Sequence, residues 1–139
     1  MFLLDTHVCI WSAEGNERQL GSRTRRLLGR AQSTDAVRIS PVTIFEVTAL
    51  HTLGRLRLTR TPEQWTREYL GQPGVRIVVL TPAIAIDAGA IPRTALVDPL
   101  DRLLVATARQ NGATLVTCDE RILDYAEATG LVRVHDGRG

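Results

Sequence analysis

Short apolar runs alternate with longer segments of helical periodicity along the whole chain. The short runs predict strands, because turn residues bound them and they are too brief for helices. They do not alternate strictly between apolar and polar positions, which is typical of a parallel sheet covered by helices on both faces. The predicted strands are residues 2–4, 37–40, 76–80, 114–117 and, as an edge strand, 131–134.

Capping residues and prolines mark where helices begin between these strands. Asp5 or Thr6 can cap a first short helix, and Ser22 an arginine-rich one. Thr61 to Gln64 form a capping box with proline at the first helical position. Further helices are expected from Pro41 to Leu53 and over 62–71, 83–90, 99–111 and 121–129, and the Gly-Arg-Gly end is interpreted as a tail.

The length of 139 residues predicts one domain, residues 1–139, without structural metal or disulfides. Cys9 and Cys118 match no metal or redox spacing and are interpreted as small core residues. No apolar run could span a bilayer, and no basic segment precedes an apolar one at the N-terminus, so we expect a cytoplasmic protein.

All 17 basic residues are arginine. The absence of lysine argues against a P-loop, a Schiff-base enzyme and a phosphoacceptor receiver domain. One explanation is codon bias in a GC-rich genome, and the other is phosphate recognition by guanidinium groups. The clusters around Arg23 and Arg26 and around Arg55 and Arg57 suit a polyanion such as RNA, but they equally suit an acidic protein partner.

Four acids are expected at one edge of the sheet. Asp5 ends the first strand and Asp119 follows the fourth, and the carboxyl ends of parallel strands are where ligands bind. Asp98 and Asp101 begin the helix that returns to the fourth strand, and a right-handed crossover starts that helix at the same edge. Asp98 alone is well explained as a helix cap. Asp101 is less so, because it shares a helix face with apolar residues.

Glu46 is a further candidate, inside an apolar stripe of its helix. The stripe positions are Val42, Phe45, Glu46, Ala49, Leu50 and Leu53. A lone buried carboxylate is costly, so the acid either lies at the solvent edge of the stripe or faces a cation or partner.

Gathered carboxylates must protonate or take up a cation, because two charges about 4 Å apart repel by ~4 kcal/mol at a dielectric near 20. Oxygen ligands without histidine or cysteine in register favour Mg²⁺ or Mn²⁺ over Zn²⁺. Such an ion can polarise a phosphoryl oxygen and activate water. His7, beside Asp5, is interpreted as structural.

In order along the chain, LLDTH, the strand and helix ending in Glu46, DPLDRLLVATA and GATLVTCD resemble the PIN domain, most closely the VapC-type toxins of type II toxin–antitoxin systems. The resemblance spans Leu3 to Asp119. It implies a PIN-like three-layer sandwich with a central, mostly parallel five-stranded sheet. It also implies a metal-dependent endoribonuclease in which activated water attacks an RNA phosphodiester, a homodimer, and a cognate antitoxin that covers the site.

By motif position, Asp5, Glu46, Asp101 and Asp119 correspond to the acidic cluster of the family, with Asp98 as an additional metal-binding acid. Thr6 and Thr117 would orient carboxylates or water. Two departures, Cys118 before the last acid and Glu120 after it, alter the local charge without removing a ligand. A catalytically inactive RNA- or partner-binding module and a DNA-directed nuclease remain as alternatives.

Overall fold

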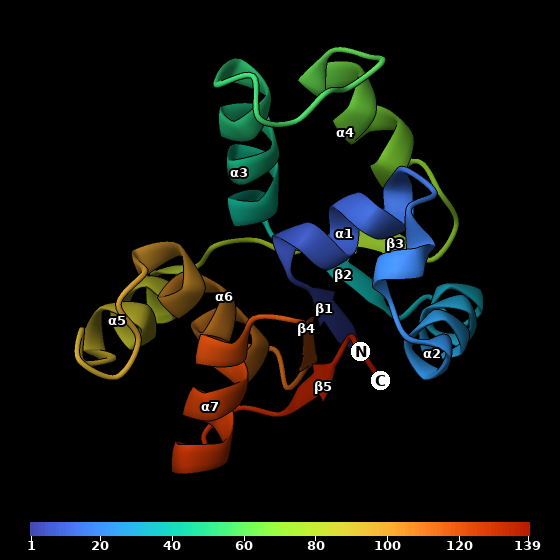
Figure 1. The fold of residues 1–139 in the computed structure, drawn as a ribbon. Helices are drawn as coiled ribbons and strands as arrows, with labels where there is room; N and C mark the ends of the chain where they lie inside the picture. Colours follow the sequence, from blue (N-terminus) through green and yellow to red (C-terminus); the bar gives the residue numbers. More distant parts are fainter.

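Five parallel strands form one sheet in the order β3-β2-β1-β4-β5, as seen in the computed structural model (Figure 1). The structure describes the backbone of residues 1–139 and every side chain except that of Glu17. The expected parallel five-stranded sheet is confirmed, and every pairing in it is parallel. The strands are β1 (Phe2–Leu4), β2 (Val37–Ile39), β3 (Val75–Ile77), β4 (Thr114–Thr117) and β5 (Val134–Asp136).

Seven α-helices connect the strands, with one short 3₁₀ helix, η1 (Glu17–Gln19), in the described chain. Four of them carry proline at the start, where the missing N–H donor costs no hydrogen bond. None of the described helices combines the length and apolarity that crossing a membrane requires. The helices are α1 (Thr6–Ala13), α2 (Ser22–Ser33), α3 (Pro41–Thr52), α4 (Pro62–Leu70), α5 (Pro82–Ala90), α6 (Pro99–Gln110) and α7 (Glu120–Thr129).

Alternate residues of the central strands divide the core between two faces of the sheet. Leu4 of β1 and Val116 of β4 pack with residues of α1, α2 and α4. The neighbouring residues Leu3 and Leu115 pack with α6 and α7 on the other face. Helix α5 packs against α6 and not directly on this core. Both faces are therefore covered, as the strand pattern predicted.

Two predicted strands are wrong at their ends, because the partner strand sets the length of an edge strand. The pattern predicts β3 to residue 80, but β2 stops at Ile39 and the last bond is donated by the Val78 N–H to the Ile39 carbonyl, at 2.9 Å. Val79 is consequently 72% exposed. The pattern predicts β5 over 131–134, but this strand pairs with Leu115–Thr117 of β4 through residues 134–136.

The start of α2 and the C-terminal segment also differ from the prediction. Helix α2 is capped by Gly21 without a side-chain hydrogen bond, and Ser22, the predicted cap, is instead its first residue. The Gly-Arg-Gly end is not a free tail. The Gly137 N–H donates to the Thr117 carbonyl at 2.9 Å, which holds the chain end against β4.

The two cysteines differ in position. Cys9 is fully buried in the core, as predicted, and burial raises the pKa of its thiol to about 12. Cys118 is only partly buried, and it lines the hollow of the candidate site described below. No disulfide joins them.

Candidate active site

All five predicted acids line one hollow of about 320 Å³ at the carboxyl edge of the sheet. Asp5 follows β1, Asp119 follows β4, and Glu46 lies in α3, the helix that follows β2. Asp98 and Asp101 lie at the start of α6, which begins at this edge as the right-handed crossover requires. Residues from both ends of the sequence thus contribute to one concave surface. His7, Trp11, Cys118 and Arg121 complete the lining.

Asp5 is held between α1 and β4 by two short hydrogen bonds. Its Oδ1 accepts from the Thr6 N–H at 2.7 Å, which caps α1, and its Oδ2 accepts from the Thr117 hydroxyl at 2.6 Å. Only 9% of the residue is exposed, and burial raises the pKa of its carboxyl, with the nearby charge of Asp119 adding to the effect. The Asp5 side chain therefore both caps α1 and lines the hollow.

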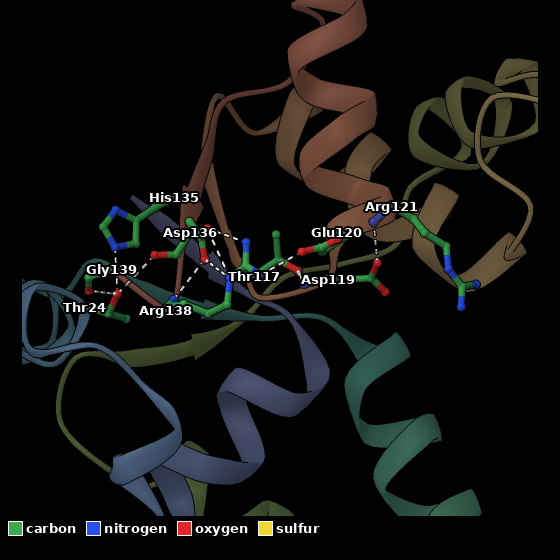
Figure 2. A network of polar contacts seen from close by, with 9 residues as sticks. All are labelled: Thr24, Thr117, Asp119, Glu120, Arg121, His135, Asp136, Arg138 and Gly139. Atoms are coloured by element: carbon green, nitrogen blue, oxygen red, sulfur yellow. Dashed lines mark hydrogen bonds and ion pairs between the residues drawn. The ribbon is translucent and has the colours of Figure 1, made fainter.

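Thr117 connects Asp5 to the turn that carries Asp119. While its hydroxyl donates to Asp5, its oxygen accepts from the Asp119 N–H at 3.0 Å. Asp119 in turn caps α7, because its Oδ1 accepts from the Arg121 N–H at 2.8 Å (Figure 2). One buried hydroxyl therefore sets the relative position of two of the acids.

Glu46 is partly buried and paired with Thr6, whose hydroxyl donates to Oε1 at 2.6 Å. Burial raises the pKa of Glu46, and the charges of Asp5 and Asp98 raise it further. The apolar stripe from which Glu46 was predicted is wrong in part, because Phe45 is 60% exposed and Leu53 is 68% exposed. The buried residues of α3 are Val42, Thr43 and Val47.

Asp98 and Asp101 have different environments although both open α6. Asp98 caps the helix through its Oδ1, which accepts from the Leu100 N–H at 2.9 Å, as its capping explanation predicted. Asp101 is 8% exposed and forms no hydrogen bond or ion pair with the described side chains. Burial raises the pKa of the Asp101 carboxyl to about 7, and the charges of all four other acids act in the same direction.

The hollow contains more negative than positive charge, which is the chemistry that a hard cation would balance. Its lining includes five acidic residues but only one arginine, Arg121, together with the exposed His7. Among the described residues, no three His, Cys, Asp or Glu side chains stand in positions that would hold one metal ion as they are. Cap hydrogen bonds occupy one oxygen of Asp98 and of Asp119, which leaves the other oxygen of each for a ligand. The oxygen-only set fits Mg²⁺ or Mn²⁺ in chemistry.

The C-terminal residues support the turn after β4 (Figure 2). The Arg138 guanidinium donates to Asp136 Oδ2 at 2.8 Å and to Glu120 Oε1 at 3.0 Å. Glu120, the unusual residue after Asp119, is therefore paired, and its charge is balanced outside the hollow. The pKa of Asp136 is lowered because of its hydrogen bond with Arg138.

The predicted RNA-binding arginines separate into two groups. Arg55 and Arg57 line a second hollow of about 500 Å³, to which His7 and Trp11 also contribute. Arg23 and Arg26 are exposed on α2 and contribute to neither hollow. Trp11 and Arg121 were not predicted as site residues. Trp11 lies four positions after His7, on the same face of α1, and this spacing was the available signal.

The metal-free protein is expected to lose stability as pH rises from about 4 to about 7. Because the folded-state pKa of Asp101 is raised from 3.8 to about 7, the folded state holds more protons than the unfolded state in this window. The contribution of Asp101 to stability is fully present below about pH 4 and is lost as the pH rises through about 7. Urea denaturation with chelator at several pH values measures this. The Asp101→Asn protein should show a flatter profile, and identical profiles for both proteins would contradict the assignment.

A family profile, a relative in sequence and solved structures all resemble this chain over nearly its whole length. The chain matches the family profile described as PIN domain over residues 2–128. Ribonuclease VapC22 from Mycobacterium tuberculosis is 31% identical over 123 residues, covering 88% of this chain and 90% of the relative. A toxin-antitoxin complex from Klebsiella pneumoniae has a similar fold, with a TM-score of 0.63 at 23% identity, covering 99% of this chain and 98% of that one. FitAcB from Neisseria gonorrhoeae gives a TM-score of 0.64 at 26% identity, with the same coverage of 99% and 98%.

Proposed function

The chain belongs to the PIN domain family, and from this premise we propose that it is a metal-dependent endoribonuclease, the toxin of a type II toxin–antitoxin pair. The observation that carries the proposal is Asp101, a carboxylate that is buried, without a hydrogen-bond partner among the described side chains, and surrounded by four other acids. Such an arrangement is unfavourable in the protein alone. It becomes favourable when a divalent cation balances the charge.

The residues proposed to hold Mg²⁺ or Mn²⁺ are the acids that line the hollow. Asp5, Glu46 and Asp101 are the principal ligands in this proposal, and Asp119 supports the ion directly or through water. Asp98 is the additional acid, with one oxygen already used for capping. When bound, the ion polarises a phosphoryl oxygen and makes water a better nucleophile.

Thr6 and Thr117 act as positioning residues in this proposal. Each donates a 2.6 Å hydrogen bond to a proposed ligand, Thr6 to Glu46 and Thr117 to Asp5. These bonds stabilise the charged form of each carboxylate and limit its rotation, which is the usual role of groups that hydrogen-bond to metal ligands. His7 is exposed at the rim and is not assigned as a general base.

The relatives support RNA as the substrate and an antitoxin as the partner. The M. tuberculosis relative is named a ribonuclease, and the K. pneumoniae structure is a toxin-antitoxin complex. We assign both properties to this chain as part of the proposal. We also propose a homodimer, which the family resemblance implies, and a cytoplasmic location, which the sequence predicts.

Removal of divalent metal is expected to abolish RNA cleavage by the purified protein. The test incubates a structured RNA with the protein and Mg²⁺ or Mn²⁺, with and without EDTA, and compares a DNA of the same sequence. Cleavage of RNA that depends on metal and is absent with EDTA supports the proposal, since the acid cluster needs a cation to bind a phosphodiester. Metal-independent cleavage, or cleavage of DNA in preference to RNA, contradicts it.

The same experiment addresses the alternative of an inactive binding module. Strong RNA binding without metal-dependent cleavage would favour that module. All five acids are present and line the hollow, whereas loss of turnover usually accompanies substitution of a ligand.

A further inference from the structure

The carboxylate hollow adjoins the second hollow, because two residues line both. His7 and Trp11 line both, and Arg55 and Arg57 lie in the second one only. A path therefore leads from the proposed cleavage site over a histidine–tryptophan pair to two arginines. Together the hollows enclose about 320 Å³ and about 500 Å³, which gives room for more than one nucleotide.

Trp11 presents an aromatic surface in a fixed position along this path. One part of its side chain packs against the core of α1 and α2, and the residue is only partly buried. The rings of His7 and Trp11 have centroids 5.8 Å apart and planes tilted by 51°, so the histidine does not cover the tryptophan by stacking. A partly exposed indole that is already ordered loses little entropy when a base stacks on it.

Arg55 and Arg57 are exposed and free for an anion, on a loop that is itself well held. Neither forms a hydrogen bond or ion pair through its side chain with the described residues. The loop is fastened to the end of α3, because the N–H groups of Arg55 and Leu56 donate to the Leu50 carbonyl at 2.9 Å and 3.2 Å. The guanidinium groups therefore extend from a defined backbone. Guanidinium forks of this kind suit bidentate pairing with phosphate.

We propose that the second hollow is a subsite for single-stranded RNA, in which one unstacked base lies on Trp11 and the adjoining backbone phosphates pair with Arg55 and Arg57. This inference rests on the proposed function, because the RNA enters the carboxylate hollow from this side. It separates the two arginine clusters: Arg55 and Arg57 contact substrate, while Arg23 and Arg26 on α2 do not. Aromatic stacking with basic contacts to the backbone is the general mode of single-strand binding.

The intrinsic fluorescence of the protein provides a direct test. Trp65, the other tryptophan, is 2% exposed and stacked on Tyr69, so a base can quench only Trp11. An unstructured RNA of eight nucleotides is titrated into the protein with EDTA present, so that no metal-dependent cleavage occurs. We expect quenching of the wild type and none of Trp11→Phe, which still binds. An abasic ribose-phosphate chain of the same length should bind without quenching.

Two substitutions measure the stacking and the ionic contacts separately. Trp11→Ala should weaken RNA binding by about 5- to 160-fold, the range for one base–aromatic stack. Arg55→Gln with Arg57→Gln should lower the slope of log Kd against log salt by about 0.7 for each phosphate that no longer pairs with an arginine. Arg23→Gln with Arg26→Gln removes the same charge elsewhere and is the matched control, expected to leave the slope nearly unchanged.

The outcomes distinguish this subsite from the proposed function. Quenching and the salt effect can be present even if no metal-dependent cleavage is found, and cleavage can be present without them. Equal quenching of Trp11→Phe, equal quenching by the abasic chain, or equal effects of the two arginine pairs would overturn the subsite. Binding of an acidic peptide to this hollow with no RNA-dependent quenching would overturn it in favour of a protein partner. Melting temperatures exclude unfolding of Trp11→Ala, and the Trp11→Phe result does not depend on that variant.

Discussion

Replacing Asp101 with Asn is expected to lower RNA cleavage by about 100-fold or more and, at the same time, to raise the stability of the metal-free protein. Asparagine keeps the size of the side chain but removes the charge that the four other acids repel. At pH 8 this repulsion opposes folding when no cation is present. Because the hollow is open to water, screening reduces the effect, and we expect a gain of about 1 kcal/mol in the free energy of unfolding.

Both halves of this expectation are measured on one preparation. Melting is followed with EDTA and with Mg²⁺, and cleavage is assayed with Mg²⁺. Magnesium should raise the melting temperature of the wild type more than that of Asp101→Asn. Asp124→Asn, an exposed acid on α7, removes the same charge outside the hollow and should change neither property. Full cleavage activity of Asp101→Asn would show that Asp101 is not part of the metal site.

The combination of lost activity and gained stability would separate a functional carboxylate from a structural one. Asp98 illustrates the contrast, since its Oδ1 accepts from the Leu100 N–H and the cap contributes to folding. Loss of Asp98 should therefore cost stability, whereas loss of Asp101 should not. In the sequence, the only sign of this difference is that Asp101, unlike Asp98, shares a face of α6 with apolar residues.

The order of elements, the parallel sheet and the membership of the PIN domain family could be predicted because each depends on local patterns. β1 and β4 are short apolar runs buried on both faces, and their predicted ends agree with the structure. The ends of β3 and β5 could not be predicted in this way. Val79 and Leu80 are as apolar as the residues that pair, but β2 provides no partner beyond Ile39.

The position of the acids could be predicted because strand ends in a parallel sheet share an edge. Asp5 and Asp119 follow from that rule directly. Glu46 was grouped with the other acids by the PIN-domain resemblance, and it lines the same hollow. The apolar stripe that also singled it out is only partly buried, since one side of α3 carries the exposed residues Phe45 and Leu53. A helix that projects beyond its sheet has fewer buried positions than its hydrophobicity indicates.

The neighbours of the acids could not be predicted, because they depend on side chains that meet only in the folded chain. The sequence predicts Trp11 only as part of a short helix, and its place between two hollows requires the loop of Arg55 and Arg57 to return to α1. The pairing of Glu120 with Arg138 requires β5 to lie beside β4. The spacing of His7 and Trp11 places both on one face of α1, but no spacing indicates that the Arg55 loop meets this face. Likewise, no spacing indicates that Arg138 meets Glu120.

Thr117→Val is expected to lower both activity and stability, because one hydroxyl serves two partners at the site. Valine has nearly the shape of threonine but can neither donate to Asp5 nor accept from the Asp119 N–H. Thr117 is fully buried, so the groups left without a partner cost about 1–3 kcal/mol in the free energy of unfolding. The pKa of Asp5, already raised by burial, should also rise further, since the Thr117 hydrogen bond is one of the contacts that lower it.

Cleavage by Thr117→Val should fall by about 10- to 100-fold, the usual effect of removing a group that orients a metal ligand. Thr117→Ser keeps the hydroxyl and loses only a methyl group, so it should retain most of the activity although it is somewhat less stable. Cleavage assays and urea denaturation on both variants separate the two effects. If Thr117→Val kept wild-type cleavage, the bond that Thr117 donates to Asp5 and the bond that it accepts from the Asp119 N–H would have no role in positioning the acids.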